Sequence, residues 1–256
     1  MRRVIVLCYH DVVGAPASGA ASGFSGPDTA SYKLDRAEFR RHLEAIAAGP
    51  PGSPEVRLTF DDGGVSTYTE IAPLLEEFNR WGYFFIPTSF IGTPGFLAKW
   101  QIRDLSLRGH VIGSHSRSHR GRMPGFAWER LAAEWIDSVA ALADITGQAI
   151  TSAAAPSGFY APRVADAAAC AGIRELFTLE PTLRTHAVAG CVVRGRYLIK
   201  RHTSASTVAR LAAGAPVERG RQFVFWNVKK AARTVLGSAY PRLRKSYFAW
   251  QGGPDA

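Results

Sequence analysis

An apolar run that ends in two adjacent carboxylates constrains this chain more than any other stretch. Val56 to Phe60 has the length and composition of a buried β-strand, and Asp61, Asp62 and two glycines follow it directly. Side chains alternate in direction along a strand, so the two acids face different surroundings. One can bind a metal ion while the other faces water or a substrate, as metal-assisted hydrolysis requires. The alternative interpretation is an acidic turn, because Asp-Gly is a common turn signal.

Strand-like and helix-like patterns alternate along most of the chain. Strands are predicted at residues 4–8, 56–60, 83–86, 111–112, 149–155, 176–178 and 192–199. Helices are predicted at residues 34–48, 71–78, 101–107, 128–142, 162–171 and 206–213, and residues 14–31 read as a long loop. This alternation predicts an α/β fold with a parallel sheet or barrel. In such folds, catalytic and ligand-binding residues lie at the carboxyl ends of the strands. Asp61, Asp62, His115 and His10 fall at such ends.

The charge of the chain is concentrated at its C-terminal end. The 256 residues, 46% of them hydrophobic, suit one α/β domain better than two, and the formal net charge is +10. Residues 217–256 contain eight basic and two acidic residues, interleaved with aromatic ones. We expect a basic, aromatic, helical extension that contacts an anionic membrane, and no nucleic-acid partner. The alternative, which the pattern slightly favours, is a helix docked on the barrel with its basic face in water.

The beginning of the sequence bears on localisation. Only Val4 to Tyr9 is apolar after the first basic residues, which is too short for the core of a signal peptide. No stretch approaches the length of a transmembrane helix. The sequence therefore predicts a cytoplasmic protein, with peripheral contact at the inner face of the membrane as a further expectation. Its three cysteines show no paired spacing, so neither a disulfide framework nor a cysteine zinc site is indicated.

Two histidines lie four residues apart beyond the predicted strand at 111–112. His115 and His119, with one carboxylate, would form a common ligand set for a divalent ion that leaves a position open for water. In zincins a Glu follows the first of two such histidines, but here Ser116 does. The general base must therefore come from elsewhere: Asp61 is the candidate, and Asp62 completes the metal triad. Two polar residues in a loop are the alternative interpretation.

Two long segments of the sequence resemble a known family. Residues 59–63 (TFDDG) and 109–119 (GHVIGSHSRSH) resemble the polysaccharide deacetylases, the NodB-homology group of carbohydrate esterase family four. The resemblance extends from Val4 to Thr178. It implies a distorted (β/α) barrel of the glycoside hydrolase/deacetylase type with fewer than eight regular repeats. We place this barrel in residues 1–216, with its core at 54–203.

The resemblance also implies an activity and the residues that carry it. The implied reaction is metal-dependent hydrolysis of an N-acyl group on an amino sugar of a saccharide. In one version of this hypothesis, the saccharide is lipid-linked. By position, Asp61 matches the catalytic base, and Asp62, His115 and His119 match the metal ligands. Zinc is the expected ion, with cobalt, nickel and manganese as alternatives.

The third motif of the family is weakened in this chain. Ala154 stands where the family has an Arg that steadies the base, and Ser157 stands where it has an aromatic residue. The charge that orients Asp61 must then come from another group. The backbone of Ser157, Gly158 and Phe159 remains a candidate for binding the oxyanion, and a plain turn is the alternative.

The last motif of the family, Leu-x-His, was not found in the sequence. Its His donates a proton to the departing amine, and His202, His186 and His10 are the candidates to replace it. A plain surface histidine is the alternative for both His202 and His186. A protonated Asp61 could also return its proton to the leaving group.

Three functions remain in competition at this point. The first is the N-deacetylase, and the second is a hydrolase of a non-sugar amide or an O-acyl ester on the same scaffold. The third is a non-catalytic accessory or binding protein, which the missing Arg and the missing Leu-x-His favour. The intact set of Asp61, Asp62, His115 and His119 argues against the third, so we expect an enzyme.

Overall fold

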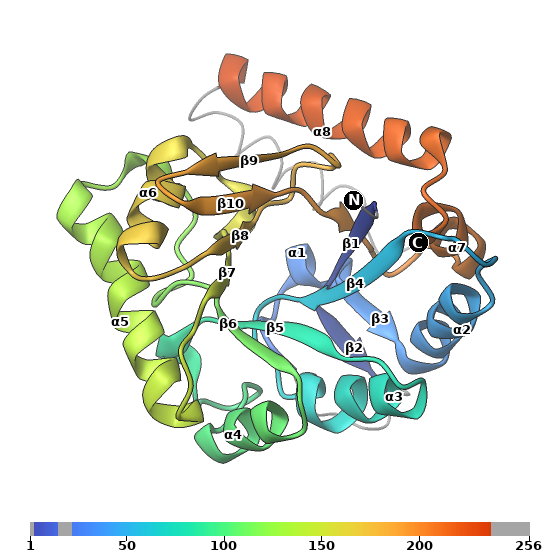
Figure 1. The fold of residues 1–256 in the computed structure, drawn as a ribbon, viewed down its shortest axis with the longest axis horizontal. Helices are drawn as coiled ribbons and strands as arrows, with labels where there is room; N and C mark the ends of the chain where they lie inside the picture. Colours follow the sequence, from blue (N-terminus) through green and yellow to red (C-terminus); the bar gives the residue numbers. More distant parts are fainter. Residues whose placement is uncertain (1–2, 15–21, 237–256) are drawn as a thin grey trace.

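Buried, largely apolar strands form the inner wall of the molecule as one curled sheet (Figure 1). The computed structural model describes residues 3–14 and 22–236. The nine strands follow the spatial order β11-β1-β4-β5-β6-β7-β8-β10-β9. In chain order they are β1 (Val4–Tyr9), β4 (Glu55–Phe60), β5 (Gly82–Ile86), β6 (Val111–Ser114), β7 (Ser152–Ala154), β8 (Glu175–Phe177), β9 (Thr185–Val188), β10 (Cys191–Arg194) and β11 (Tyr197–Leu198).

The sheet is parallel except at one end, where β9 pairs antiparallel with β10. Outside it lie α2 (Arg36–Ala47), α3 (Ala72–Glu77), α4 (Lys99–Leu107), α5 (Trp128–Thr146), α6 (Pro162–Cys170) and α7 (Ala205–Ala212). No helix separates β8 from β10 or β10 from β11, so the helix-strand repeat is incomplete. The predicted distorted (β/α) barrel with fewer than eight regular repeats is therefore confirmed.

Aromatic rings fill the space between the first strands and α2. The ring of Tyr9 lies 5.4 Å from those of both Phe39 and Phe60, and Phe60 lies 5.5 Å from Phe84. All four side chains are buried, and each buried aromatic ring stabilises the fold by about 1.5–3 kcal/mol. This packing anchors the strands whose ends carry the acidic residues.

The predicted strand at 192–199 is wrong as a single element. The structure divides it into β10 and β11, which pair with different strands far apart in the sheet. Gly195 lies at the break, where a Cβ would come within 2.1 Å of the carbonyl oxygen of Glu180. Only glycine allows the chain to pass so close to that backbone, and the crossing turns Arg196 into the barrel.

The predicted loop at 14–31 is only partly described, because residues 15–21 lie outside the described range. Its last part contains a short helix, α1 (Pro27–Ala30), followed by β3 (Lys33–Asp35). β3 pairs with β2 (Asp11–Val13) in a second, two-stranded sheet.

The C-terminal segment begins with the long helix α8 (Pro216–Leu236), which lies across one side of the barrel (Figure 1). The Gln222 side chain joins it to β11 by accepting a hydrogen bond from the Leu198 amide at 3.0 Å and donating one to the Leu198 carbonyl at 3.1 Å. The rest of the predicted extension, residues 237–256, lies outside the described residues. Among the described helices, none combines the length and apolarity needed to cross a bilayer.

Candidate active site

The carboxyl end of β4 places the two acidic residues at the mouth of the barrel. The backbone amide of Asp61 still donates to the carbonyl of Tyr9, at 3.1 Å, and so continues the β1–β4 ladder. Asp62 has a φ of 77°, in the left-handed region. The chain thus turns sharply between the two residues, and their carboxylates reach different partners, as the strand pattern predicted.

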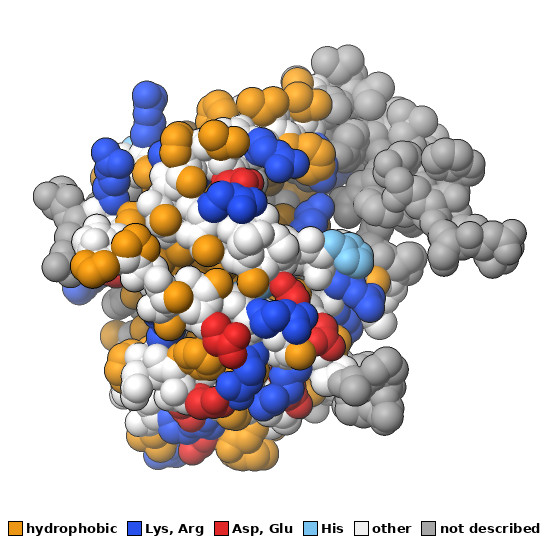
Figure 2. Space-filling view, turned by 90° about the vertical axis from the view of Figure 1, so that its right-hand side faces the viewer, with side chains coloured by type: hydrophobic (Ala, Val, Ile, Leu, Met, Phe, Trp, Pro, Cys, Tyr) orange, Lys and Arg blue, Asp and Glu red, His pale blue; other side chains and the backbone are white. Residues whose placement is uncertain are grey.

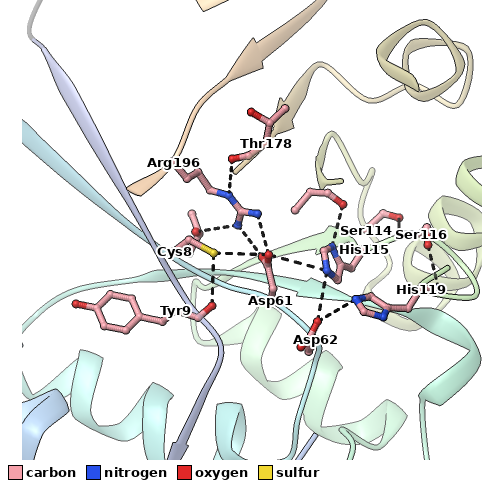
Figure 3. Close-up of polar contacts among 12 residues, drawn as sticks. Cys8, Tyr9, Asp61, Asp62, Ser114, His115, Ser116, His119, Thr178 and Arg196 are labelled. Carbon is pink, nitrogen blue, oxygen red and sulfur yellow. Dashed lines mark hydrogen bonds and ion pairs between the residues drawn. The ribbon is translucent and has the colours of Figure 1, made fainter. Parts of the chain in front are cut away.

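Asp62 converges with the two predicted histidines (Figure 3). Its Oδ1 lies 3.5 Å from Nε2 of His115 and 3.1 Å from Nε2 of His119. One ligand atom from each residue lies within 4.8 Å of the other two. The structure therefore brings together all three predicted metal ligands, from the ends of β4 and β6.

Neighbouring groups fix the orientation of both imidazoles. His115 follows β6 directly, and its Nδ1 lies 2.9 Å from the carbonyl oxygen of Ala154, to which it donates. This hydrogen bond leaves the Nε2 lone pair of His115 free to bind a metal. The His119 ring stacks on Phe24 at 4.6 Å, while its amide donates to the hydroxyl of Ser116. Supporting contacts of this kind are typical of ligands that are held ready for a metal.

The electrostatics of this cluster favour a cation. Burial raises the pKa of Asp62, but the two histidines lower it more, so its pKa lies well below the usual range. Burial lowers the pKa of His115, but Asp61 and Asp62 raise it more. The buried carboxylate of Asp61 and the partly buried carboxylate of Asp62 thus create a negative field at the imidazoles. One carboxylate and two imidazoles with an open side fit a zinc-type divalent ion.

Arg196 supplies the charge that the third motif lacks (Figure 3). Its guanidinium is fully buried and forms a bidentate pair with Asp61, with N–O distances of 2.6 and 2.8 Å. It also donates to the hydroxyl of Thr59 and to the carbonyl of Thr178. Burial raises the pKa of Asp61, but Arg196, together with His115 and His10, lowers it more, so the pKa lies below its ordinary value. Asp61 is therefore ionised and held in one orientation.

Sequence reasoning missed Arg196. The signal that could have revealed it is a glycine and an arginine in the middle of an apolar run, since a long charged side chain in a buried strand must meet a partner. The small thiol of Cys8 also contacts Asp61, at 3.6 Å from Oδ2. Burial raises the pKa of that thiol, so Cys8 stays protonated and acts as a weak donor to the carboxylate.

These groups open into a cavity of about 460 Å³ at the carboxyl ends of the strands. Asp61 and the three metal-binding candidates lie on its wall. The rest of the wall comes from several elements and includes His10, Tyr32, Lys200, Phe225, Trp226 and Lys229.

The three residues proposed for the oxyanion are placed differently. Ser157 lines the cavity with a φ of 56°, in a short turn at residues 156–158. Gly158 and Phe159 line a neighbouring hollow instead, and their amides donate within the same turn, to Ala155 and Pro156. Ser157 is therefore the member of this group that the structure brings to the site.

The three candidate proton donors also lie in different parts of the structure. His10 lines the cavity, its ring lies 4.7 Å from that of Tyr32, and its buried Nδ1 has no hydrogen-bond partner among the described residues. His186 lies on the edge strand β9, with Nε2 2.9 Å from the Tyr160 hydroxyl, and His202 is exposed in a turn. Neither of these two histidines belongs to the described cavity wall. The structure therefore brings only His10, of the three, to the reaction site.

A curled α/β barrel with an Asp-His-His cluster beside a buried, arginine-bound carboxylate has the groups that a metal-assisted hydrolase would need. Residues 48–176 match the family model for polysaccharide deacetylase. The chain therefore belongs to the polysaccharide deacetylase family, whose members hydrolyse carbon–nitrogen bonds.

Two individual relatives match part of this chain. The chain is 26% identical over 168 residues to the putative polysaccharide deacetylase YxkH of Bacillus subtilis, covering 66% of this chain and 58% of YxkH. It is 29% identical over 143 residues to an uncharacterised 30.6 kDa protein of Geobacillus stearothermophilus, covering 55% of this chain and 52% of the relative. The chain thus spans little more than half the length of these relatives.

Solved structures share the fold. The Streptococcus pyogenes deacetylase PplD, in complex with acetate, superposes with a TM-score of 0.67 at 19% identity, covering 82% of this chain and 97% of PplD. IcaB from Ammonifex degensii superposes with a TM-score of 0.65 at 23% identity, covering 83% of this chain and 98% of IcaB. At these identities the likeness establishes the architecture.

Proposed function

We propose that this protein is a metal-dependent deacetylase that removes the acetyl group from an N-acetylated amino sugar of a saccharide. The observation that carries this proposal is the convergence of Asp62, His115 and His119 beside Asp61 in one cavity. Family membership supports the reaction type. Zinc is the ion that we propose, because two imidazoles and one carboxylate suit it, with cobalt, nickel and manganese as alternatives.

In this mechanism each side chain has one task. A divalent ion held by Asp62, His115 and His119 would polarise the acyl carbonyl and lower the pKa of water. Asp61 removes the proton from the attacking water at its carboxylate, which Arg196 keeps ionised and oriented.

Two further groups act on the other side of the scissile bond. His10 donates a proton to the departing nitrogen, because it is the candidate histidine whose ring reaches the cavity. The turn at Ser157 provides polar groups for the developing oxyanion. Both assignments belong to this proposal.

Removal of divalent metal is expected to abolish acetate release from N-acetylated oligosaccharides. Protein treated with a chelator and dialysed should be inactive, and one equivalent of zinc should restore turnover, because the ion would polarise the acyl carbonyl and lower the pKa of the attacking water. Acetate is measured with an enzyme-coupled assay, alongside the metal content. Full activity of metal-free protein would refute metal dependence, and inactivity of the zinc-loaded protein on every N-acetylated saccharide would refute the proposed substrate class.

We further propose that α8 binds an anionic membrane surface, where a lipid-linked saccharide would be presented to the cavity. Val217, Val224 and Val228 lie on one face of the helix and are exposed by 69%, 62% and 61%. Figure 2 shows hydrophobic side chains along the upper edge of the molecule, where α8 lies. The helix carries five basic residues and one acidic residue, and the acidic one, Glu218, is paired with Arg210. An exposed apolar face on a helix of net positive charge suits an anionic lipid surface.

The double variant Val224→Asp/Val228→Asp is expected to bind vesicles with anionic lipid about tenfold more weakly than the wild type. Flotation of protein with vesicles of mixed neutral and anionic phospholipid measures this binding. Leu107→Asp is the matched control, because Leu107 is a 73% exposed apolar residue on α4, across the barrel from α8. Equal flotation of all three proteins would rule out α8 as the contact. Location in the cytoplasm, at the inner face of the membrane, remains part of this proposal.

A further inference from the structure

The loop that carries the two histidines of the cluster contains backbone conformations that must be held in place. Ser116 has a φ of 61° and His119 has a φ of 53°, both in the left-handed region that residues other than glycine seldom adopt. Such conformations cost free energy and persist where the surrounding structure enforces them. The contacts that hold residues 115–119 therefore decide where the imidazole of His119 lies.

A buried glutamate on α5 binds the middle of this loop. Glu134 is only 7% exposed. Its Oε2 accepts a hydrogen bond from the Ser118 amide at 2.8 Å, and its Oε1 accepts one from the Ser118 hydroxyl at 2.6 Å. Its backbone carbonyl accepts a third, from the Arg117 amide at 3.0 Å. Ser118 directly precedes His119, so these bonds fix the backbone next to a metal-binding side chain.

A second polar residue of α5 supports the same loop one helical turn further on. The Ser138 hydroxyl lies 2.7 Å from that of Ser114, whose oxygen also accepts a hydrogen bond from the Ser116 amide at 3.1 Å. Residues four apart share a face of a helix, so Glu134 and Ser138 point to the same side of α5. The other buried residues of this helix are mainly apolar. Polar groups at these two positions are explained by the loop rather than by packing.

The position of Glu134 carries a cost that its contact with the loop offsets. A buried carboxylate is unfavourable unless hydrogen bonds replace the water that it loses. Ser118 supplies two such bonds, through its amide and its hydroxyl. A metal ligand that is ordered before the ion arrives binds it more tightly, because less conformational freedom is lost on binding.

We propose that Glu134 is a positioning residue of the metal site. Through Ser118 it holds the loop in the conformation that brings His119 to Asp62. Glu134 is neither a member of the ligand cluster nor part of the described cavity wall, so it acts through the backbone. This proposal rests on the proposed metal-dependent function, because it concerns the residues that would hold the ion.

Zinc affinity measures this role without depending on turnover. Metal-free wild type and Glu134→Ala are each titrated with zinc in competition with a chromophoric chelator. Glu134→Ala should bind zinc about tenfold more weakly, at the lower end of the usual loss when a group that supports a metal ligand is removed. An unchanged dissociation constant in Glu134→Ala would overturn the proposal.

Glu134→Gln tests whether hydrogen bonds to the loop carry the effect. The side-chain oxygen of Gln can accept from the Ser118 amide, and its nitrogen can donate to the Ser118 hydroxyl. Zinc affinity should therefore return close to the wild-type value. A loss as large as in Glu134→Ala would show that these bonds do not hold the ligand, and would contradict the proposal.

Asp137→Ala is the matched control. Asp137 also lies on α5 and pairs with Arg117 of the same loop at 3.0 Å, but the two side chains are 47% and 58% exposed. An exposed pair of this kind contributes little, so zinc affinity should not change. A loss equal to that of Glu134→Ala would show that the effect is not specific to the buried carboxylate, and would overturn the assignment.

Ser118→Ala is the milder variant and decides the question even if Glu134→Ala does not fold. Ser118 is partly exposed, and the change removes only the bond to Oε1. Zinc should bind more weakly than in the wild type but more tightly than in Glu134→Ala. In the Glu134→Ala background the same change should have no further effect, because the bond is already lost. An unchanged affinity in Ser118→Ala, or equal losses in both backgrounds, would contradict the link between the two residues.

Hydrogen exchange of the metal-free protein separates this proposal from the function on which it rests. The Ser118 amide should be protected in the wild type and exchange faster in Glu134→Ala, with no ion present. If that difference is found but the wild type binds no zinc, the proposed metal site is refuted while Glu134 still holds the loop. If the wild type binds zinc but neither exchange nor affinity changes in Glu134→Ala, the positioning role alone is refuted.

Discussion

Replacement of Asp61 by Asn is expected to lower kcat/KM for acetate release by about 10²- to 10⁴-fold, the usual contribution of a general base. The Asn side chain keeps the size of the carboxylate but cannot take a proton from water. Bound metal should stay at the wild-type stoichiometry, because Asp62, His115 and His119 are unchanged. Acetate release and metal content are measured on the same samples. Wild-type activity in Asp61→Asn would refute the role of Asp61.

His10→Gln provides the matching test on the leaving-group side. Its turnover of the amide should fall sharply, while its turnover of an activated aryl acetate should fall much less, because that leaving group departs without a proton. Parallel losses on both substrates would show that His10 does not act as the acid. His202→Gln is the control, since His202 is exposed and lies outside the described cavity wall.

Arg196→Met is expected to lower the free energy of unfolding at neutral pH by about 3–5 kcal/mol, because it leaves the buried carboxylate of Asp61 without its partner. Activity should fall as well, since the bidentate pair no longer orients the base. Urea unfolding of metal-free protein measures the first effect. Arg194→Met is the control: Arg194 lies two residues earlier, and its ion pair with Glu175 is partly exposed, so a change of about 0–1 kcal/mol is expected.

The stability lost in Arg196→Met should depend on pH. In the wild type, the pKa of Asp61 is lowered below its ordinary value of 3.8, so its stabilising contribution is complete above that value and is lost as the pH falls through the folded-state pKa. In the variant, burial acts without Arg196 and raises the pKa, so the ionised carboxylate destabilises the fold at neutral pH. The difference between the two proteins should therefore shrink as the pH is lowered from 7 towards 4. A difference that stays constant over this range would contradict the ion-pair account.

The sequence alone was sufficient to predict which four side chains meet at the mouth of the barrel. Asp61, Asp62, His115 and His119 lie in two short motifs at the ends of apolar strands, and a parallel sheet gathers such ends at one edge. The strands and helices nearest these motifs were predicted to within a few residues for the same reason: their apolar periodicity is local and strong.

The residues that complete the cavity could not be predicted in this way. Arg196 lies 135 positions from Asp61, and its role depends on Gly195 breaking an apolar run that reads as one strand. Lys200 and Lys229 line the same cavity only because β11 pairs with β1 and α8 then crosses the barrel. Both arrangements depend on contacts between segments that are far apart in the sequence, and local periodicity does not encode such contacts.

The Arg196 pair also bears on the non-catalytic alternative. That hypothesis drew support from the missing Arg of the third motif, but the structure shows a buried, bidentate arginine on Asp61 from another part of the chain. The site therefore has the orienting charge that a general base needs. An intact ligand cluster and an oriented base favour an enzyme over a binding protein.

Anomalous diffraction at the zinc edge, from crystals of the zinc-loaded protein, tests the central claim most directly. The account predicts one strong peak per chain, within bonding distance of Nε2 of His115, Nε2 of His119 and a carboxylate oxygen of Asp62, with Asp61 beside it but bound to Arg196. A zinc ion bound elsewhere, or no peak here in crystals whose protein carries stoichiometric zinc, would contradict it.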